Sequence, residues 1–180
     1  MAVQKFNEGK GIIIAGMSGS SGKTLVTCLI LSSFKNRNLR VQSFKIGPDY
    51  IDPGYHAHYT SNPSINLDPW IMGREHIIKE AKENTKTSFG VIEGVMGLFD
   101  GSDKYSDINS TMEVSRWLGW PLLLVVPCKN AGRSITIAIK GFLNEAGGRD
   151  KFAGIIFNQI NSNSHADYLQ KACKNLDVPI

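Results

Sequence analysis

Short apolar runs alternate with longer, mixed stretches along this chain of 180 residues. Five runs bounded by turn residues are predicted to be buried parallel strands, at residues 11–15, 41–46, 89–93, 122–126 and 153–157. The stretches between them are typical of helices, at residues 23–35, 75–84, 110–118, 134–145 and 165–176. Strands that alternate with helices in this way predict an α/β fold, in which helices cover both faces of a parallel sheet.

Polar, glycine-containing segments follow the carboxyl ends of the predicted strands. They occupy residues 16–24, 47–59, 94–103, 127–133 and 158–163. In an open α/β sheet these strand ends share one edge, and ligands bind at that edge. Segments that are far apart in the sequence are therefore expected to form a single site.

The first of these segments reads G-M-S-G-S-S-G-K-T. A strand, a glycine-rich loop, a Lys-Thr pair and a helix in this order predict a phosphate cradle whose backbone N–H groups face the anion. Lys23 is expected to reach the terminal phosphates, and the Thr24 hydroxyl to bind Mg²⁺. The usual G-x-x-x-x-G-K-[ST] spacing is altered, because Met17 takes the place of the first glycine, which stands one residue earlier. The predicted nucleotide-binding residues here are Gly16, Ser18, Gly19, Ser20, Ser21, Gly22, Lys23 and Thr24.

Charged residues also follow the second predicted strand, in F-K-I-G-P-D-Y-I-D-P-G-Y-H at residues 44–56. Lys45 stands near the strand end, where a second lysine can neutralise charge on a transferring phosphoryl group. Asp49 and Asp52 lie three residues apart and offer the hard oxygen ligands that suit Mg²⁺. An isolated D-x-x-D is more often a solvated acidic turn, and only the flanking motifs favour the metal interpretation.

The third predicted strand runs into V-I-E-G-V-M-G-L-F-D-G, residues 91–101. Glu93 ends the apolar run, which is a Walker-B-like arrangement that holds Mg²⁺ directly or through water. Asp100 lies further along the same loop. Both acids are therefore predicted to belong to the site.

Composition and charge narrow the class of protein. The chain is 42% hydrophobic and 20% charged, which is ordinary for one soluble globular domain. No apolar run approaches the ~20 residues of a membrane helix, and the polar residues 1–10 do not predict a signal peptide, so a cytoplasmic location is expected. The net charge of +4 is too scattered to favour nucleic acid as a partner.

Cysteine, histidine and tryptophan residues are not predicted to form a further site. Three widely spaced cysteines predict neither a disulfide framework nor a metal site, and the three tryptophans are expected to be packing residues. His56 and His58 lack a third metal ligand, so zinc is not expected; a histidine in this loop contacts substrate or no ligand at all.

Several motifs in a fixed order give this chain its resemblance to a known family. They read I-I-I-A-G…S-G-K-T, F-K-I-G-P-D-Y-I-D-P-G-Y-H, N-L-D-P-W-I-M, V-I-E-G-V-M-G-L-F-D-G and F-N-Q-I. Together they resemble the N-terminal, ATP-using domain of cobyrinic acid a,c-diamide synthases. Close relatives in that family act on hydrogenobyrinic acid, sirohydrochlorin-type tetrapyrroles or sirohaem. The fold implied is the P-loop NTPase-type α/β fold shared with dethiobiotin synthetase.

The resemblance implies an ATP- and Mg²⁺-dependent amidation of a tetrapyrrole polycarboxylate. ATP would convert a side-chain carboxylate into an acyl phosphate, and ammonia would then displace phosphate. Lys23 and Lys45 would hold phosphates. The Mg²⁺ ligands would be Thr24, Asp49 and Glu93, and the residues that place the carboxylate and the ammonia would be Asp52 and Asp100.

The same resemblance implies which residues recognise the ligands. Asn158 would recognise adenine, while Tyr50 and Ile51 would help to choose the reacting side chain of the macrocycle. The other residues expected on the substrate side are His56, Asn66 and Asp68.

Family members usually continue into a class I glutaminase domain, which releases ammonia from glutamine with a Cys-His pair. This chain ends at Ile180, where the family would go on, so residues 1–180 are expected to be the ATP-binding domain, with the glutaminase domain as its partner. Cys173 is not expected to be the glutaminase nucleophile. The sequence leaves open whether the chain forms a homodimer.

Three other functions remain as alternatives. They are a sirohydrochlorin or sirohaem amidase, a dethiobiotin-synthetase-like ligase and a regulatory ATPase of the MinD and ParA type. The G-P-D-Y-I-D and N-L-D-P-W segments disfavour the second, because they match the diamide synthases. Met17 disfavours the third, because MinD and ParA proteins typically carry lysine at that position.

Overall fold

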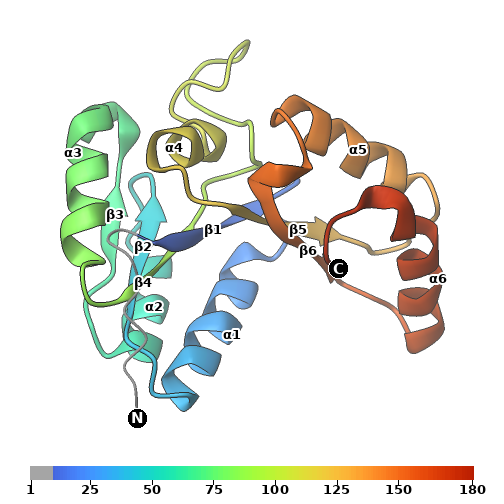
Figure 1. Ribbon diagram of the computed structural model, residues 1–180, viewed down its shortest axis with the longest axis horizontal. Helices are drawn as coiled ribbons and strands as arrows, with labels where there is room; N and C mark the ends of the chain where they lie inside the picture. The colour runs from blue at the N-terminus through green and yellow to red at the C-terminus, as the bar shows by residue number, and fades with distance from the viewer. Residues whose placement is uncertain (1–9) are drawn as a thin grey trace.

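A computed structural model describes residues 10–180 of the chain. Its strands form one parallel sheet in the order β3-β2-β4-β1-β5-β6 (Figure 1). The strands are β1 Gly11–Gly16, β2 Val41–Ile46, β3 Ile65–Leu67, β4 Phe89–Glu93, β5 Leu122–Pro127 and β6 Phe152–Asn158. The predicted α/β class with a parallel sheet is confirmed. The polar start of the chain, on which the signal-peptide prediction depends, lies almost entirely in residues 1–9, outside the described residues.

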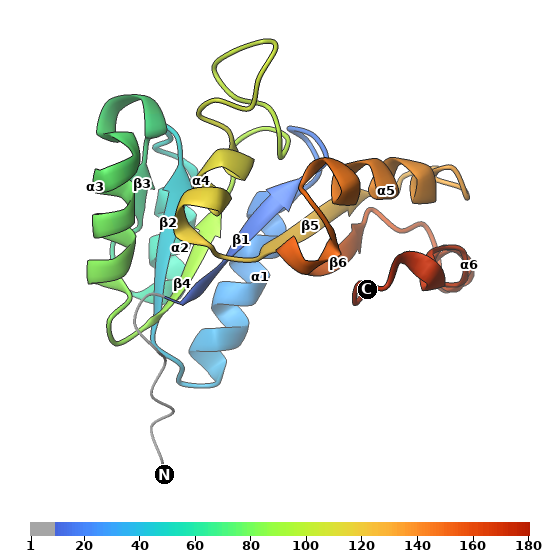
Figure 2. The ribbon, with the colours of Figure 1, turned by 45° about the horizontal axis from the view of Figure 1, so that its top comes forward.

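Helices cover both faces of the sheet, as predicted. They are α1 Lys23–Asn36, α2 Asp52–Thr60, α3 Pro69–Asn84, α4 Thr111–Leu118, α5 Ile135–Glu145 and α6 Asn163–Cys173, with short 3₁₀ turns at Arg149–Lys151 and Lys174–Leu176. Figures 1 and 2 together show α1 and α2 on one face, with α3, α4 and α5 on the other. None of the helices within residues 10–180 is long and apolar enough to cross a bilayer.

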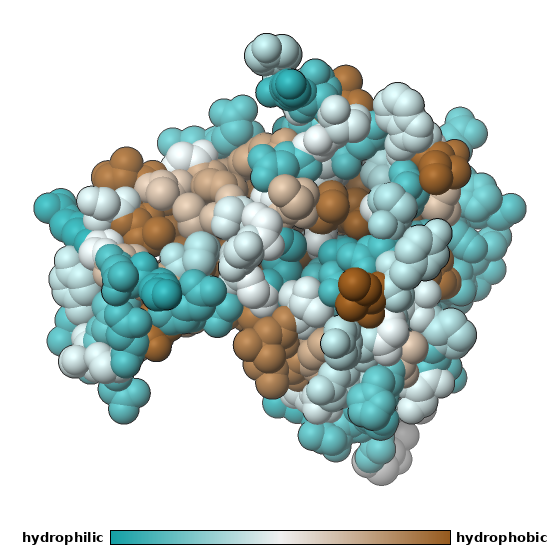
Figure 3. All heavy atoms as spheres, turned by 180° about the vertical axis from the view of Figure 1, so that it is seen from behind, coloured by the Kyte–Doolittle hydropathy of each residue, from teal (hydrophilic) through white to brown (hydrophobic). Residues whose placement is uncertain are grey.

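Alternate side chains of the central strand β1 enter two separate apolar cores. Ile13 and Ala15 pack in the core beneath α3, α4 and α5, whereas Ile14 packs with Val26 and Leu31 of α1 on the opposite face. A strand covered on both faces needs apolar residues on both sides, so it reads as a continuous apolar run. The outer surface seen in Figure 3 is mostly hydrophilic or intermediate, with separate hydrophobic areas.

Helix α2 and strand β3 were not predicted. Residues 47–59 were expected to be a polar loop, but α2 begins at Asp52. The Asp49 carboxylate oxygen Oδ1 starts this helix by accepting hydrogen bonds from the backbone N–H groups of Ile51 (2.8 Å) and Asp52 (3.1 Å). Strand β3 adds a short parallel edge to β2, and the Gly47 N–H donates to the Leu67 carbonyl at 2.9 Å.

Helix α3 begins six residues earlier than the predicted helix, at Pro69 instead of residue 75. The Asp68 side chain caps it by accepting hydrogen bonds from the backbone N–H groups of Trp70 and Ile71. Gly73 then interrupts the helix with non-helical dihedral angles, φ 69° and ψ 169°. The first turn of α3 is thereby set apart from the rest of the helix.

All three cysteines are buried free thiols, in agreement with the prediction that they form no disulfide. Loss of hydration on burial raises the pKa of the Cys128 thiol to about 11. The Cys173 sulfur lies 3.4 Å from the hydroxyl of Thr136, between α6 and α5. The thiols therefore serve as packing groups within the fold.

Candidate nucleotide and substrate site

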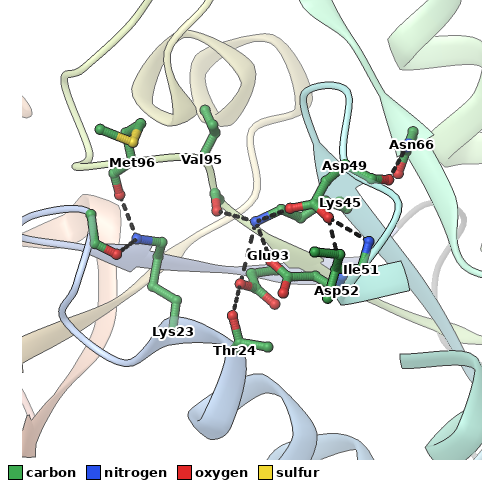
Figure 4. A network of polar contacts seen from close by, with 12 residues as sticks. Lys23, Thr24, Lys45, Asp49, Ile51, Asp52, Asn66, Glu93, Val95 and Met96 are labelled. Atoms are coloured by element: carbon green, nitrogen blue, oxygen red, sulfur yellow. Dashed lines mark hydrogen bonds and ion pairs between the residues drawn. The ribbon is translucent and has the colours of Figure 1, made fainter. Parts of the chain in front are cut away.

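The sheet changes direction beside β1. The chain leaves β1, passes β4 to reach β2, and later returns through β4 to β5 on the other side of β1. Such a reversal opens a crevice at the carboxyl ends of the strands, where ligands bind in open α/β sheets. Hydrogen bonds there join the loops after β1, β2 and β4 (Figure 4), so the predicted convergence of these loops is confirmed.

The loop between β1 and α1 is closed around Lys23. Its ammonium donates to the carbonyl oxygens of Ser18 (3.1 Å) and Gly19 (3.4 Å), and to the carbonyl of Met96 in the loop after β4. Burial lowers the pKa of Lys23, and the nearby positive charge of Lys45 lowers it further. A partly desolvated ammonium held only by neutral carbonyls is suited to exchange them for phosphate oxygens.

Two glycines allow this loop to fold tightly. A Cβ atom on Gly16 would lie 2.1 Å from the hydroxyl oxygen of Ser21. Gly22 has a left-handed φ of 90°, and a Cβ there would lie 2.0 Å from the Asn158 amide nitrogen. Glycine is therefore required at position 16, although this position is one residue earlier than in the usual motif.

Glu93 lies at the centre of the polar network, with only 1% of its surface exposed. Its Oε1 accepts a hydrogen bond from the Thr24 hydroxyl at 2.7 Å and lies 3.3 Å from the Lys45 ammonium. Its Oε2 lies 2.7 Å from Nε2 of His56. Burial alone would raise the pKa of Glu93, but the His56 hydrogen bond, the Lys45 charge and the Thr24 hydrogen bond together lower it. The carboxylate is therefore charged at neutral pH.

Lys45 is the counter-ion of the acidic residues around it (Figure 4). Its ammonium lies 2.9 Å from the Asp52 carboxylate, 3.3 Å from Glu93 and 3.8 Å from Asp49. It also donates to the Gly94 carbonyl at 3.1 Å. One buried cation thus offsets charge contributed by the ends of two strands and the start of α2.

The oxygen atoms beside the phosphate loop fit Mg²⁺ bound together with a nucleotide. The Thr24 hydroxyl and the Glu93 carboxylate are hard ligands that already lie within hydrogen-bond distance. No group of three Asp, Glu, His or Cys side chains within residues 10–180 forms a metal cluster. Mg²⁺ in nucleotide sites is held by one or two carboxylates, and phosphates and water supply the other positions. Asp49, the third predicted ligand, accepts backbone hydrogen bonds just before α2 with one oxygen and faces Lys45 with the other.

His56 is not placed as a loop residue that faces substrate. It lies on α2 with 0% of its surface exposed, and its Nδ1 is 3.3 Å from the Ser64 hydroxyl. Because its other ring nitrogen contacts Glu93, His56 orients that carboxylate. No residue pattern indicates this pair, because the contact requires α2, which was not predicted.

The remaining predicted substrate residues lie just before α2, on β3 and at the start of α3. Tyr50 and Ile51 are exposed. The Asn66 amide donates to the Asp49 carbonyl at 2.7 Å and so fixes the loop before α2. Asp68 caps α3. These positions agree with a supporting role for Asn66 and Asp68.

Asn158 and Asp100 each form a hydrogen bond that supports a loop of the site. The Asn158 amide donates to the Ser21 carbonyl at 2.9 Å, so it supports the phosphate loop from β6. Asp100 is exposed, and its Oδ2 accepts a hydrogen bond from the Gly97 N–H at 2.9 Å.

An apolar cleft of about 380 Å³ adjoins the polar network. It lies between the loop after β2, the first turn of α3 and the loop after β4, and is lined among others by Pro48, Trp70, Ile71, Val95, Met96 and Asp100. The prediction that the tryptophans are packing residues holds for Trp120, which is 5% exposed, but is wrong for Trp70, which is 78% exposed. Trp70 belongs to the N-L-D-P-W motif, but the exposure of its side chain depends on the cap of α3, which the motif alone does not indicate.

Comparison with known proteins places this geometry among nucleotide-binding domains. Residues 12–180 match the family described as the CobQ/CobB/MinD/ParA nucleotide binding domain. The cobyrinate a,c-diamide synthase of Synechococcus sp. is 39% identical over 170 residues, which cover 94% of this chain and 37% of that protein. The enzyme of the same name from Methanococcus maripaludis is 40% identical over 172 residues, which cover 95% of this chain and 38% of that protein. The chain thus spans less than two fifths of the length of these curated relatives.

Solved structures share the fold at low sequence identity. Chloroplast FtsY from Physcomitrella patens superposes with a TM-score of 0.68 at 15% identity, covering 99% of this chain and 60% of that one. FtsY from Mycoplasma mycoides gives a TM-score of 0.61, also at 15% identity, with the same coverage of each chain. This likeness supports the fold class alone.

Proposed function

Because the chain belongs to the CobQ/CobB/MinD/ParA nucleotide-binding-domain family, we propose that it uses ATP to activate a tetrapyrrole carboxylate for amidation. It would act as the N-terminal part of a cobyrinate a,c-diamide synthase. The relatives that bear this name support the substrate class. The observation that carries the proposal is the network in which Glu93 joins Thr24 of the phosphate loop to Lys45 of the substrate loop.

The phosphate loop and Lys23 bind the triphosphate of ATP, in exchange for the carbonyl contacts that Lys23 makes in this structure. Thr24 and Glu93 hold Mg²⁺, which supplies charge neutralisation on the phosphates when bound. Lys45 lies next to Asp52 and Glu93 and brings a second positive charge close to the transferred phosphoryl group.

The proposed reaction has two steps, transfer of a phosphoryl group and formation of the amide. An oxygen of the substrate carboxylate attacks the γ-phosphorus, the bond from that phosphorus to the bridging oxygen breaks, and ADP leaves. The nitrogen of ammonia then attacks the acyl carbon of the acyl phosphate, inorganic phosphate leaves, and the nitrogen loses a proton. Asp52 and Asp100 position the reacting groups, because carboxylates accept hydrogen bonds from incoming ammonia.

A further glutaminase domain of a longer chain is the proposed source of ammonia, since the matched relatives are more than twice as long as this chain. Cys173 is buried and lies beside Thr136, so it is no candidate for the glutaminase nucleophile. Free ammonium takes the place of that domain in the test below.

The test is ATP-to-ADP turnover by the chain with Mg²⁺ and ammonium. Cobyrinate, sirohydrochlorin and sirohaem are compared with no substrate, with DNA and with anionic lipid vesicles. We expect turnover with a tetrapyrrole, together with the mass change of amide formation. Turnover that responds to DNA or vesicles, and to none of the tetrapyrroles, would overturn the proposal in favour of a regulatory ATPase.

A further inference from the structure

Two large apolar side chains stand exposed side by side at the start of α3. Trp70 is 78% exposed and Ile71 is 76% exposed, and both line the apolar cleft beside the polar network. Met96, from the loop after β4, lines the same cleft and is also exposed. Exposing contiguous apolar surface costs about 25 cal/mol per Å², so such patches mark places where something binds.

The local structure holds these two side chains outward. Asp68 Oδ1 accepts hydrogen bonds from the backbone N–H groups of Trp70 (2.9 Å) and Ile71 (3.2 Å). Pro69 occupies the first helical position, where its fixed φ and missing N–H favour a helix start. Because Gly73 breaks the helix, the direction of this turn is independent of the long segment of α3 that packs on the sheet.

The cleft shares a wall with the phosphate site. Met96 lines the cleft, and its backbone carbonyl accepts a hydrogen bond from the Lys23 ammonium. Asp100, one of the predicted catalytic residues, lines the cleft from the same loop. Met96 therefore separates a molecule in the cleft from the Lys23 ammonium.

The residues that line the cleft determine which kind of ligand surface can bind there. Its charged side chains are those of Asp68 and Asp100, both acidic, and Asp68 is engaged in capping α3. A carboxylate would be repelled there, whereas the apolar face of a flat ring packs well against an indole. A tetrapyrrole acid has such faces, and its carboxylates lie around the rim.

We propose that this cleft binds the apolar ring face of the tetrapyrrole substrate and that Trp70 is its stacking residue, a specificity-determining contact. The inference rests on the proposed function. With the ring face on Trp70, a rim carboxylate extends past Met96 toward Lys23, while the other carboxylates remain in solvent.

The test measures binding of cobyrinate, of sirohydrochlorin and of Mg²⁺–ATP, each separately, by calorimetry, with the chain and three variants. Stacking on an aromatic side chain is worth about 1–3 kcal/mol, so Trp70→Ala should weaken cobyrinate binding by about fivefold to 150-fold. Trp70→Phe should restore most of the affinity. Tyr105→Ala is the matched control, because Tyr105 is 95% exposed in the same loop as Met96 but does not line the cleft.

The possible results distinguish a failure of this inference from a failure of the proposed function. Wild-type affinity for cobyrinate in Trp70→Ala overturns the cleft assignment and leaves the proposed function standing. Equal weakening of cobyrinate and ATP binding, in Trp70→Ala and in Trp70→Phe, shows a general structural role and also overturns it. A wild-type chain that binds ATP but neither cobyrinate nor sirohydrochlorin removes the proposed function, and this inference with it.

Discussion

Replacing Glu93 with glutamine tests the centre of the network, because the change keeps the shape of the side chain and removes its charge. Glu93 is buried and contacts Thr24, Lys45 and His56 through its two oxygens. The amide oxygen can still accept the hydrogen bond from Thr24. The variant therefore isolates the contribution of the negative charge.

The expected loss of stability follows from these contacts. A hydrogen bond to a charged group contributes about 1.5–3 kcal/mol and a neutral one about 0.5–1.5 kcal/mol. The contacts with Lys45 and His56 each lose about 1 kcal/mol, so Glu93→Gln should lower the free energy of unfolding by about 2 kcal/mol at neutral pH. The loss stays below the ~3–5 kcal/mol expected for a buried ion left alone, because Lys45 keeps Asp52 at 2.9 Å.

The pH dependence has a definite sign. The folded protein holds the pKa of Glu93 below its ordinary value of 4.5, so the carboxylate stabilises the fold fully above pH 4.5. That contribution is lost as the pH falls through the lower pKa of the folded state. Glutamine does not titrate, so the difference between the wild type and the variant should narrow as the pH falls below 4.5.

Urea unfolding at neutral pH and below pH 4.5 measures the loss of stability and its pH dependence. ATP turnover with cobyrinate and ammonium is measured as well, and we expect Glu93→Gln to abolish it, because glutamine binds Mg²⁺ poorly. Glu113→Gln is the control, since this carboxylate accepts a hydrogen bond from the Asn109 N–H at the start of α4. It should cost about 1 kcal/mol or less and leave turnover intact. Wild-type turnover in Glu93→Gln, or a stability difference that widens on acidification, would refute the reasoning.

Further predictions concern the phosphate loop and a buried thiol. Lys23→Ala should weaken ATP binding by about hundredfold or more in calorimetry, and unchanged affinity would contradict its phosphate role. Gly22→Ala and Gly119→Ala both strain a positive φ by about 1–2 kcal/mol, but only the Gly22 change meets Asn158 at 2.0 Å, while Gly119 has open space. Gly22→Ala should therefore cost more stability in urea unfolding, and equal costs would speak against the close contact. Because burial raises the pKa of Cys128 from 9.0 to about 11, its share of stability is present below pH 9.0 and lost toward pH 11. Cys128→Ala should remove that part of the alkaline loss, and an unchanged pH profile would exclude it.

The central sheet was predictable because its signal is local. Strands covered on both faces read as apolar runs, and each is bounded by turn residues. Strand β3 escaped prediction because only Leu67 of its three residues is buried. Helix α2 escaped because Pro53 and Gly54 near its start are typical of loops, although proline is well tolerated in a first helical turn.

The members of the site were predictable, but several of their contacts were not. Strand ends identified Lys45 and Glu93, since parallel strands bring their carboxyl ends to one edge. The pairing of Glu93 with His56 needs a helix that the sequence did not indicate. The Met96 carbonyl reaches Lys23 because Met96 adopts a φ of 46°, a conformation that methionine rarely takes and no residue pattern announces.

The ion pairs of Lys45 have a consequence for whether folding must wait for ligand binding. Three carboxylates brought to one sheet edge would repel one another, but the lysine between them forms an ion pair with each. The charges at this edge are therefore offset within the chain itself, so the domain does not need a bound ligand to offset them when it folds. Under the proposed function, ATP would exchange contacts that the folded chain already makes, so folding and the first reaction would be separate events.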